Sequence, residues 1–362
     1  MKKFFALLAL LSLCVPALCA DPTMAELNPE FEGRIVQALK PSNVTYKYRE
    51  ETQPLSLFFF SDIHGDALEF GRLAAFYTQY EKYFDGAICT GDLVKASYVE
   101  GFGYWGKTPG HEKIMAVIGN HDTLRDHKNW KNADWNDQIS IGEAYERYMA
   151  PYIAGWDVTY EVGKTYYYKD YDAKKIRLIV LDCMLRPEID KKAEKGQMDW
   201  FKATLAAAKE KDLNVISAYH FPMRKTAALK CNFTEYGRGG GASWYDTTNN
   251  YQKAVDEFMK NGGKFVCWFG GHTHKDLIDY NPAYPDQIDV IVSAAGRSNC
   301  DQYSDMSRFD GTRSMDLANA LIIDTSTSCI RIIRIGANTD SHQTQRNGIT
   351  FNYKTKEIYS QY

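Results

Sequence analysis

Beyond its first twenty residues, the sequence lacks an apolar run long enough to cross a lipid bilayer, which takes about 20 residues. It also lacks an excess of basic residues, because 43 lysines and arginines stand against 46 aspartates and glutamates, a formal net charge of −3. A slightly acidic chain is a poor non-specific ligand for nucleic acid. We therefore expect no membrane span in the mature chain and no specific nucleic-acid partner. The oligomeric state is left open.

The first twenty residues have a different character from the rest. Lys2 and Lys3 precede an apolar run of about a dozen residues, and small residues come before Asp21. This layout is typical of a secretory signal, and the run is too short for a membrane anchor. Leu precedes both Cys14 and Cys19, which disfavours a lipoprotein signal. We expect residues 1–20 to be removed on export, leaving a secreted or periplasmic protein.

Cysteine is scarce, with eight in 362 residues. Cys89, Cys183 and Cys267 lie within apolar runs, so we expect buried thiols there. Cys231 and Cys300 lie in polar segments, and export would permit a disulfide between them. Sequence alone does not give connectivity, so that pairing stays open.

Short apolar runs alternate with segments whose apolar residues recur every three or four positions, a pattern that predicts an α/β fold. The expected strands are residues 57–61, 86–90, 113–119, 176–182, 214–219, 264–270 and 289–294. The expected helices are residues 67–83, 197–211 and 251–261. Residues 320–336 and 348–360 have the pattern of β-hairpins. We predict a lead-in at 21–54, one main domain at 55–340 and a C-terminal β-hairpin extension at 341–362 that packs on it.

Side chains that bind metal ions follow several of these strands. They are Asp62, His64, Asp92, Asn120, His121, His220, His272 and His274. These include five of the eight histidines, all but His111, His127 and His342. A lone strand-end Asp or His is usually a hydrogen-bonded or capping residue. Because ligands bind outside the carboxyl ends of strands in open α/β sheets, the repetition predicts one shared site.

Spacing and donor type suggest the kind of ion. Residues two apart in an extended segment share a face, so Asp62 and His64 form one pair, and His272 and His274 another. Mixed oxygen and nitrogen donors suit a divalent transition ion better than calcium. We expect the glycines beside these ligands to allow sharp turns or close approach; they are Gly65, Gly91, Gly119, Gly270 and Gly271. Asp66, three residues before Glu69, is instead predicted to cap a helix.

Five fragments, "SDIHGD", "GDLV", "GNHD", "AYHFP" and "GGHTH", occur in this order between residues 61 and 274. As a set they resemble the calcineurin-like metallophosphoesterase family. The resemblance implies a four-layer αββα sandwich of two mixed β-sheets flanked by helices. It also implies that Asp62, His64 and His274 hold one metal ion, that Asn120, His220 and His272 hold a second, and that Asp92 bridges both.

The same resemblance implies a reaction. Two divalent transition ions, manganese, iron or zinc, would activate a bridging hydroxide that attacks the phosphorus of a small phosphate mono- or diester. His121, free of metal, would assist the leaving oxygen. Asp122 either orients His121 or is a surface or helix-start residue, and the sequence favours neither reading.

Departures from the pattern narrow the subtype. No Asp-Arg-Gly run follows the GD motif, unlike the Ser/Thr protein phosphatases, and His64 and Lys95 stand where purple acid phosphatases carry Gly and Tyr. Two long polar segments are candidate pocket walls, since long loops are usually functional. Arg224 and Arg238, with Trp244 and Tyr245, lie in the first; Arg297 and Arg308 lie in the second. We predict that the arginines contact phosphate, although decorated surface loops are an alternative.

Two alternative functions explain less of the sequence than a phosphoesterase does. A non-catalytic secreted binding protein on the same scaffold is the main alternative, but it gives no chemical reason for all seven ligands and His121 to be present. A zinc-dependent amide hydrolase is disfavoured because the sequence has no HExxH stretch.

Overall fold

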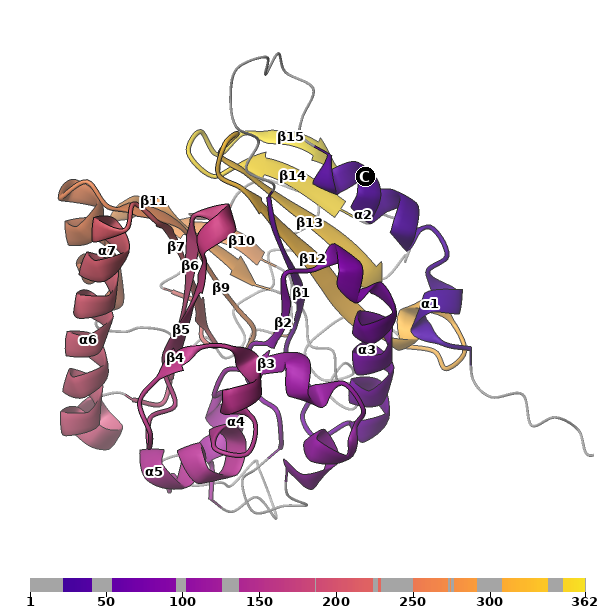
Figure 1. The fold of residues 1–362 in the computed structure, drawn as a ribbon, viewed down its shortest axis with the longest axis horizontal. Coiled ribbons are helices and arrows are strands. Elements are labelled where there is room, and N and C mark those ends of the chain that lie inside the picture. The colour runs from indigo at the N-terminus through magenta and orange to yellow at the C-terminus, as the bar shows by residue number, and fades with distance from the viewer. Residues whose placement is uncertain are drawn as a thin grey trace, which may run out of the picture.

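The computed structural model describes residues 22–40, 54–95, 102–125, 137–185, 187–223, 227–228, 250–272, 274, 277–291, 308–337 and 348–361. Two β-sheets lie face to face in its centre, and helices cover their outer faces (Figure 1).

The first sheet is mixed and, within the described residues, has seven strands in the order β15-β14-β13-β12-β1-β2-β3. Strands β1, β2 and β3 are parallel, and the remaining pairs are antiparallel. The bounds are β1 Leu55–Phe60, β2 Gly86–Cys89, β3 Ile114–Ala116, β12 Leu317–Asp324, β13 Cys329–Gly336, β14 Gly348–Asn352 and β15 Ile358–Gln361.

The second sheet is also mixed, with eight described strands in the order β4-β5-β6-β7-β9-β11-β10-β8. Strands β6, β7, β9 and β11 form its parallel centre. The bounds are β4 Thr159–Tyr160, β5 Tyr167–Tyr171, β6 Ile176–Leu181, β7 Asn214–Tyr219, β8 Ala227–Ala228, β9 Lys264–Gly270, β10 Leu277–Asn281 and β11 Tyr284–Ile291.

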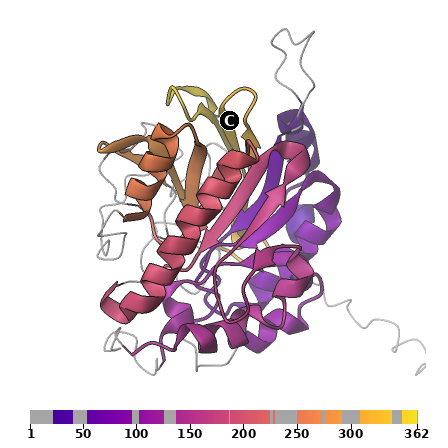
Figure 2. The ribbon, with the colours of Figure 1, turned by 60° about the vertical axis from the view of Figure 1, so that its left-hand side comes forward.

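Seven α-helices lie in the described part of the chain. They are α1 Met24–Leu27, α2 Phe31–Leu39, α3 Ala67–Tyr80, α4 Asn120–Thr123, α5 Ile141–Ala144, α6 Pro187–Glu210 and α7 Asn250–Lys260. Helices α6 and α7 cover the second sheet, and Figure 2 shows α6 running across its outer face. Helices α2 and α3 cover the first sheet on the opposite side of the molecule (Figure 1).

Strand β1 shows why the layers form. Its residues alternate between the two faces of the sheet. Phe58 stacks on Phe76 and Tyr77 of α3, with ring centroids 5.9 and 5.8 Å away. The next residue, Phe59, meets Phe269 of β9 edge-on at 5.2 Å, so its side chain packs between the two sheets. The continuous apolar run of β1 therefore reflects burial on both faces.

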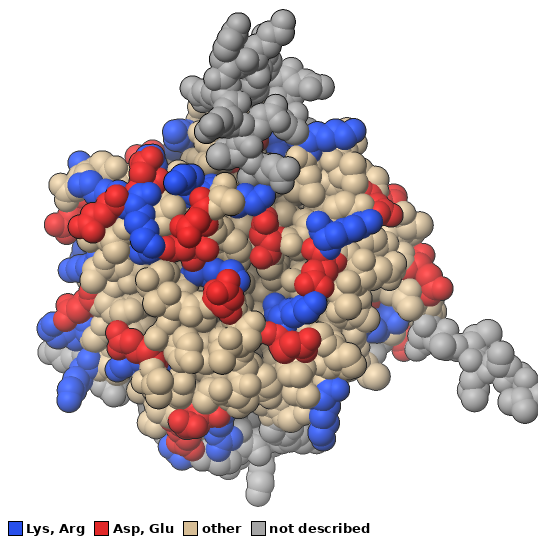
Figure 3. Space-filling model, viewed as in Figure 1, with Lys and Arg blue, Asp and Glu red and all other residues tan. Residues whose placement is uncertain are grey.

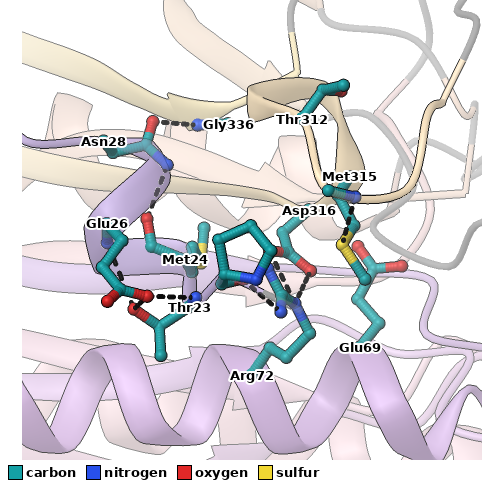
Figure 4. A network of polar contacts seen from close by, with 12 residues as sticks. Thr23, Met24, Glu26, Asn28, Glu69, Arg72, Thr312, Met315, Asp316 and Gly336 are labelled. Atoms are coloured by element: carbon teal, nitrogen blue, oxygen red, sulfur yellow. Dashed lines mark hydrogen bonds and ion pairs between the residues drawn. The ribbon is translucent and has the colours of Figure 1, made fainter. Parts of the chain in front are cut away.

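Hydrogen bonds join the N-terminal segment, residues 22–40, to the first sheet and to α3 (Figure 4). Arg72 of α3 donates to the carbonyl oxygen of Pro22 at 2.7 Å and binds the Asp316 carboxylate through Nε and Nη2. Asn28 accepts the backbone N–H of Gly336 at 3.0 Å. The predicted lead-in thus contains two helices that pack on the main domain.

The predicted fold class is confirmed, since both sheets are mixed and flanked by helices. The C-terminal hairpin β14–β15 adds to the edge of the first sheet through β13, as expected. The pattern missed β4, β5, β8 and β10. Strand β5, for example, is tyrosine-rich and only partly buried in its centre, so it lacks the apolar run that marks β1.

Several other predictions can be compared with the structure. Cys89, Cys183 and Cys267 are buried free thiols, as is Cys329. Cys231 and Cys300 lie outside the described residues, as do residues 1–21, so the disulfide and the secretory signal stay predictions. Within the described residues, no helix combines the length and apolarity needed to cross a membrane. On the face seen in Figure 3, acidic and basic side chains are interspersed.

Candidate metal centre

The predicted ligands lie at the carboxyl ends of strands from both sheets. Asp62 and His64 follow β1, Asp92 follows β2 and Asn120 lies beyond β3, all from the first sheet. His220 follows β7, and His272 and His274 follow β9, from the second sheet. Because the parallel strands of each sheet end at one edge, the site forms where the two edges meet.

One cluster of donors consists of Asp62, His64, Asp92 and His274. All four side chains are buried, and each offers a ligand atom within 4.8 Å of the others. The Nε2 atoms of His64 and His274 face one another at 3.2 Å. Nε2 of His274 lies 3.4 Å from Oδ1 of Asp62. Two imidazole nitrogens and two carboxylates thus converge on one point.

A second cluster consists of Asp92, His220 and His272, within the same 4.8 Å limit. Nε2 of His220 lies 3.3 Å from Oδ1 of Asp92, while Oδ2 of Asp92 lies 3.7 Å from Nε2 of His64. The two oxygens of Asp92 therefore face different clusters, so Asp92 belongs to both. This is the arrangement that a carboxylate bridging two ions would have.

The backbone at the ligands is unusual. Positive φ angles occur at Asp62 (58°), His64 (49°), Asp92 (53°), His272 (69°) and His274 (53°). Non-glycine residues rarely adopt this left-handed region, and each such residue costs on the order of 1–3 kcal/mol. Asp62 and His64 do lie in one cluster, as expected. The expected cause, one face of an extended segment, was wrong, because both residues have left-handed backbone. A tight turn, rather than a strand, directs both side chains inward.

Close packing of the ligand loops explains two of the glycines. A Cβ atom on Gly119 would lie 2.2 Å from Oδ1 of Asp92. A Cβ atom on Gly271 would lie 2.4 Å from Oδ2 of Asp62 and 1.8 Å from the Ser61 hydroxyl oxygen. Any side chain at either position would displace a predicted ligand carboxylate, so the close-approach expectation is confirmed here.

A hydrogen bond to a backbone carbonyl fixes which nitrogen of His220 faces the site. Nδ1 of His220 lies 2.7 Å from the carbonyl oxygen of Thr90. Since a carbonyl oxygen only accepts, Nδ1 carries a hydrogen, and Nε2 is the nitrogen that faces Asp92. This geometry holds the imidazole in the tautomer that ligates a metal through Nε2.

The polar atoms of the site fit bound cations. Asp62 and Asp92 are 0% and 1% exposed, and among the described residues no lysine or arginine pairs with either carboxylate. Within the same residues, Oδ1 of Asn120 and Nε2 of His220 are buried without a hydrogen-bond partner. Buried carboxylates without a lysine or arginine partner, and buried polar atoms without a hydrogen bond, raise the free energy of the fold. Divalent cations bound here would compensate both.

Comparison with protein-family models agrees with this geometry. The model of the calcineurin-like phosphoesterases matches residues 55–276, more than half of the chain. The chain belongs to the calcineurin-like phosphoesterase family. The matched residues include every strand that carries a predicted ligand, from β1 to β9.

Several solved structures are similar to this chain at low sequence identity, and the first of them supports the same fold. A dimetal phosphatase from Danio rerio has a TM-score of 0.50 and 10% identity, over 83% of this chain and 99% of that one. A putative 5'-nucleotidase from Staphylococcus aureus has a TM-score of 0.41 and 12% identity, over 75% and 51%. GAP50, the anchor in the inner membrane complex of Plasmodium, has a TM-score of 0.39 and 12% identity, over 85% and 88%. No curated protein matches the sequence.

The family assignment makes the chain a metal-dependent phosphoester hydrolase. Its buried donors form a candidate dinuclear site for divalent ions. Sequence-based recognition of the calcineurin-like family from the five ordered motifs is therefore confirmed.

The pKa shifts at the phosphoesterase site differ from residue to residue. Burial would raise the pKa of Asp62, but His274 and His220 outweigh it and lower that pKa to about 2. Burial and the charge of His220 lower the pKa of His272 to about 3. At His220, burial lowers the pKa but the Asp92 carboxylate outweighs it, raising the pKa to about 9. A metal ion at His220 would therefore displace a proton.

His121 lies at the edge of the first cluster. Its ring meets that of His64 edge-on at 4.7 Å, and its Nε2 lies 4.0 Å from Oδ2 of Asp92. Its side chain is 21% exposed, whereas that of Asp92 is 1% exposed. Nδ1 of His121 lies 2.8 Å from the carbonyl oxygen of Lys95, an interaction that the side-chain pattern could not reveal. His121 is thus beside the donors and accessible from solvent.

Asp122 does not orient His121 directly. Its side chain is fully buried, and its two oxygens accept the backbone N–H groups of Val94 and Gly119 at 3.0 and 2.7 Å. Asp122 lies in the short helix α4, and a surface position is excluded. Among the described residues, the Lys95 backbone carbonyl is a direct partner of the His121 ring.

Two further predicted residues, Asp66 and Arg308, lie within the described part of the chain. Asp66 caps α3, accepting the N–H of Glu69 at 3.0 Å, as expected. Arg308 was wrongly predicted as an anion contact, since its side chain is 4% exposed and pairs with buried Glu69 at 3.3 Å. Arg224, Arg238 and Arg297 lie outside the described residues, as do Trp244 and Tyr245, so their substrate roles stay predictions.

Proposed function

We propose that this chain is an exported enzyme that hydrolyses small phosphate mono- or diesters with two divalent transition ions. The observation that carries the proposal is the position of Asp92, whose two oxygens face two separate clusters of buried donors. A single metal site would not need a carboxylate shared in this way.

Each ion has its own set of ligands in this proposal. Asp62, His64 and His274 would hold the first ion, and Asn120, His220 and His272 the second, with Asp92 binding both. Two such ions supply Lewis acidity at the phosphoryl group and lower the pKa of a bound water toward ~7. Two carboxylates leave the ions with excess positive charge, so an anionic ester is attracted.

His121 is the candidate proton donor to the leaving oxygen. Because Nδ1 donates to the Lys95 carbonyl, Nε2 is the nitrogen that faces the site. A protonated His121 would therefore give its Nε2 proton to the ester oxygen as the P–O bond breaks. Arg224, Arg238 and Arg297 are proposed to bind the remaining phosphate charge.

The decisive experiment combines metal analysis with two ester substrates. The purified chain would be assayed on 4-nitrophenyl phosphate and bis(4-nitrophenyl) phosphate, as prepared, after chelation, and after addition of manganese, iron or zinc. We expect about two ions per chain, hydrolysis of at least one ester, and loss of activity on chelation. A metal-loaded chain that cleaves neither ester would favour the binding-protein alternative.

Export rests on the layout of residues 1–20 and has its own test. The full-length chain would be expressed in a bacterial host, and the N-terminal residue of the protein outside the cytoplasm would be determined. We expect a mature chain that begins at or beside Asp21. Retention of Met1 on a cytoplasmic protein would contradict export without affecting the enzymatic proposal.

A further inference from the structure

Two ligand-bearing segments are joined by a buried carboxylate. The first segment, residues 91–95, follows β2 and carries Asp92; the second, residues 119–122, opens α4 and carries Asn120 and His121. Asp122 accepts the N–H of Gly119 within its own segment at 2.7 Å and the N–H of Val94 in the other at 3.0 Å. Its side chain is fully buried, so water does not compete for these bonds.

The same segments are joined again at His121. Its backbone N–H donates to Oδ1 of Asp92 at 3.0 Å, and its Nδ1 lies 2.8 Å from the Lys95 carbonyl oxygen. Lys95 directly follows Val94, whose N–H is held by Asp122. The position of the Lys95 carbonyl therefore depends on the bond between Asp122 and Val94.

We propose that Asp122 is a positioning residue for His121: it holds Val94, and so fixes the Lys95 carbonyl that sets the tautomer and orientation of the imidazole. This inference rests on the proposed function, in which His121 protonates the leaving oxygen. Tyr104 supports the segment from elsewhere, since its hydroxyl donates to the carbonyl oxygen of Leu93. The role differs from direct contact, because Asp122 acts through two backbone groups.

The Asp122→Asn substitution tests the proposal with little change in shape. An Asn side chain has one acceptor oxygen, and its NH₂ group would face an N–H donor, so one of the two bonds is lost. We expect kcat/KM for phenyl phosphate, which has a poor leaving group, to fall by about 10- to 100-fold, because misplacing a catalytic group by about 1 Å costs up to ~100-fold. For 4-nitrophenyl phosphate, whose leaving group needs little protonation, the loss should be below about 3-fold.

A double variant separates positioning from general damage. If Asp122 acts through His121, Asp122→Asn should add little to the loss caused by His121→Ala, since coupled residues are not additive. Metal content should stay at the wild-type value. Equal losses on both esters, additive losses in the double variant, or loss of metal would overturn the proposal. Asp66→Asn is the matched control, because Asn caps a helix as well as Asp does; it should keep wild-type rates.

A readout without turnover separates this proposal from the proposed function. In metal-free and zinc-loaded chain labelled with ¹⁵N-histidine, the ring signals of His121, assigned with His121→Ala, report its tautomer. We expect hydrogen on Nδ1 in the wild type and a mixed population in Asp122→Asn. If that variant does not fold, Tyr104→Phe loosens the same segment and should give a smaller shift in the same direction. An unchanged tautomer in a folded variant would refute positioning, even if the wild type hydrolyses neither ester.

Discussion

At the scale of single residues, the predicted ligands of this phosphoesterase are not equivalent. Asp92 faces both donor clusters, whereas His64 belongs to one and His220 to the other. The Thr90 carbonyl oxygen accepts a hydrogen bond from Nδ1 of His220 and so fixes the orientation of its ring. Replacing a shared ligand should therefore affect both ions, while replacing an unshared ligand should affect one.

We predict that Asp92→Ala lowers the bound metal from about two ions per chain to near zero, and that His220→Ala lowers it to about one. Elemental analysis after gel filtration measures the ratio. Both variants should lose at least ~100-fold in kcat/KM, because both ions are needed for the reaction. If Asp92→Ala retains as much metal as His220→Ala, the carboxylate does not bridge.

A partly buried ion pair outside the site provides a pH-dependent prediction. Arg177, whose side chain is 1% exposed, binds Asp170 through Nε and Nη2 at 2.6 and 2.8 Å and packs over the ring of Tyr168. Burial would raise the pKa of Asp170, but hydrogen bonds from Arg177 and Lys211 outweigh it and lower that pKa. A lowered carboxyl pKa stabilises the fold above the unfolded pKa of ~4, and this stabilisation is lost as pH falls through the folded value.

Asp170→Asn should therefore destabilise the chain by about 3–5 kcal/mol at pH 7, because it leaves the Arg177 charge buried and unpaired. The difference in unfolding free energy from wild type should shrink at pH 3, because that pH lies below the unfolded pKa of ~4. Denaturant titrations at both pH values measure it. Asp199→Asn, at an exposed pair with Lys195, is the control and should change stability by less than ~0.5 kcal/mol. A difference that is independent of pH would contradict the assignment.

How far sequence anticipates the site depends on which atoms make the contacts. The ligand side chains and the Asp66 cap follow from residue type and spacing. The left-handed backbone at Asp62 and His64 does not, because local preference opposes it and only the surrounding packing enforces it. The Lys95 carbonyl that holds His121 is equally invisible, since any residue type could supply a backbone oxygen.

At the scale of elements, periodicity identified the long helices and buried strands but undervalued the N-terminal segment. Helix α2 has only nine residues, yet its Phe31 is 1% exposed and its Ile35 is fully buried. The Phe31 ring lies 5.0 Å from Phe76 and 5.1 Å from Tyr80, both on α3. Such a short helix is stable only because tertiary contacts bury one face, which sequence patterns cannot show.

We predict that Phe31→Ala destabilises the chain by about 3–5 kcal/mol through lost burial and the cavity left among the α3 aromatics. Val36→Ala, on the exposed side of the same helix at 38% exposure, should change stability by less than ~1 kcal/mol. Thermal or denaturant unfolding of both variants measures the difference. Equal and small effects would show that the N-terminal segment is not part of the cooperative domain.

At the scale of the whole molecule, the metal centre lies where the two sheets meet. Asp62 and Asp92 come from the first sheet, and His220, His272 and His274 from the second. Away from the site, Phe59 and Phe269 hold the sheets together through packing alone. Metal ions would therefore link the sheets at one edge of their interface, whose other contacts include the hydrogen bond from the Tyr167 hydroxyl to the Ala116 carbonyl oxygen.

Removing the ions should thus destabilise the entire fold rather than one loop. Without them, two buried carboxylates lose the positive charge that compensates theirs. Several buried imidazole nitrogens lose their partner. Bound ions stabilise by an amount that grows with free metal concentration, about 4 kcal/mol at 1,000 times the dissociation constant. Calorimetry of the wild type should show one transition whose midpoint falls on chelation and rises again with added manganese or zinc. Because Asp92→Ala cannot hold the ions, its midpoint should not respond to chelation, whereas an unresponsive wild type would show that the sheets do not depend on metal.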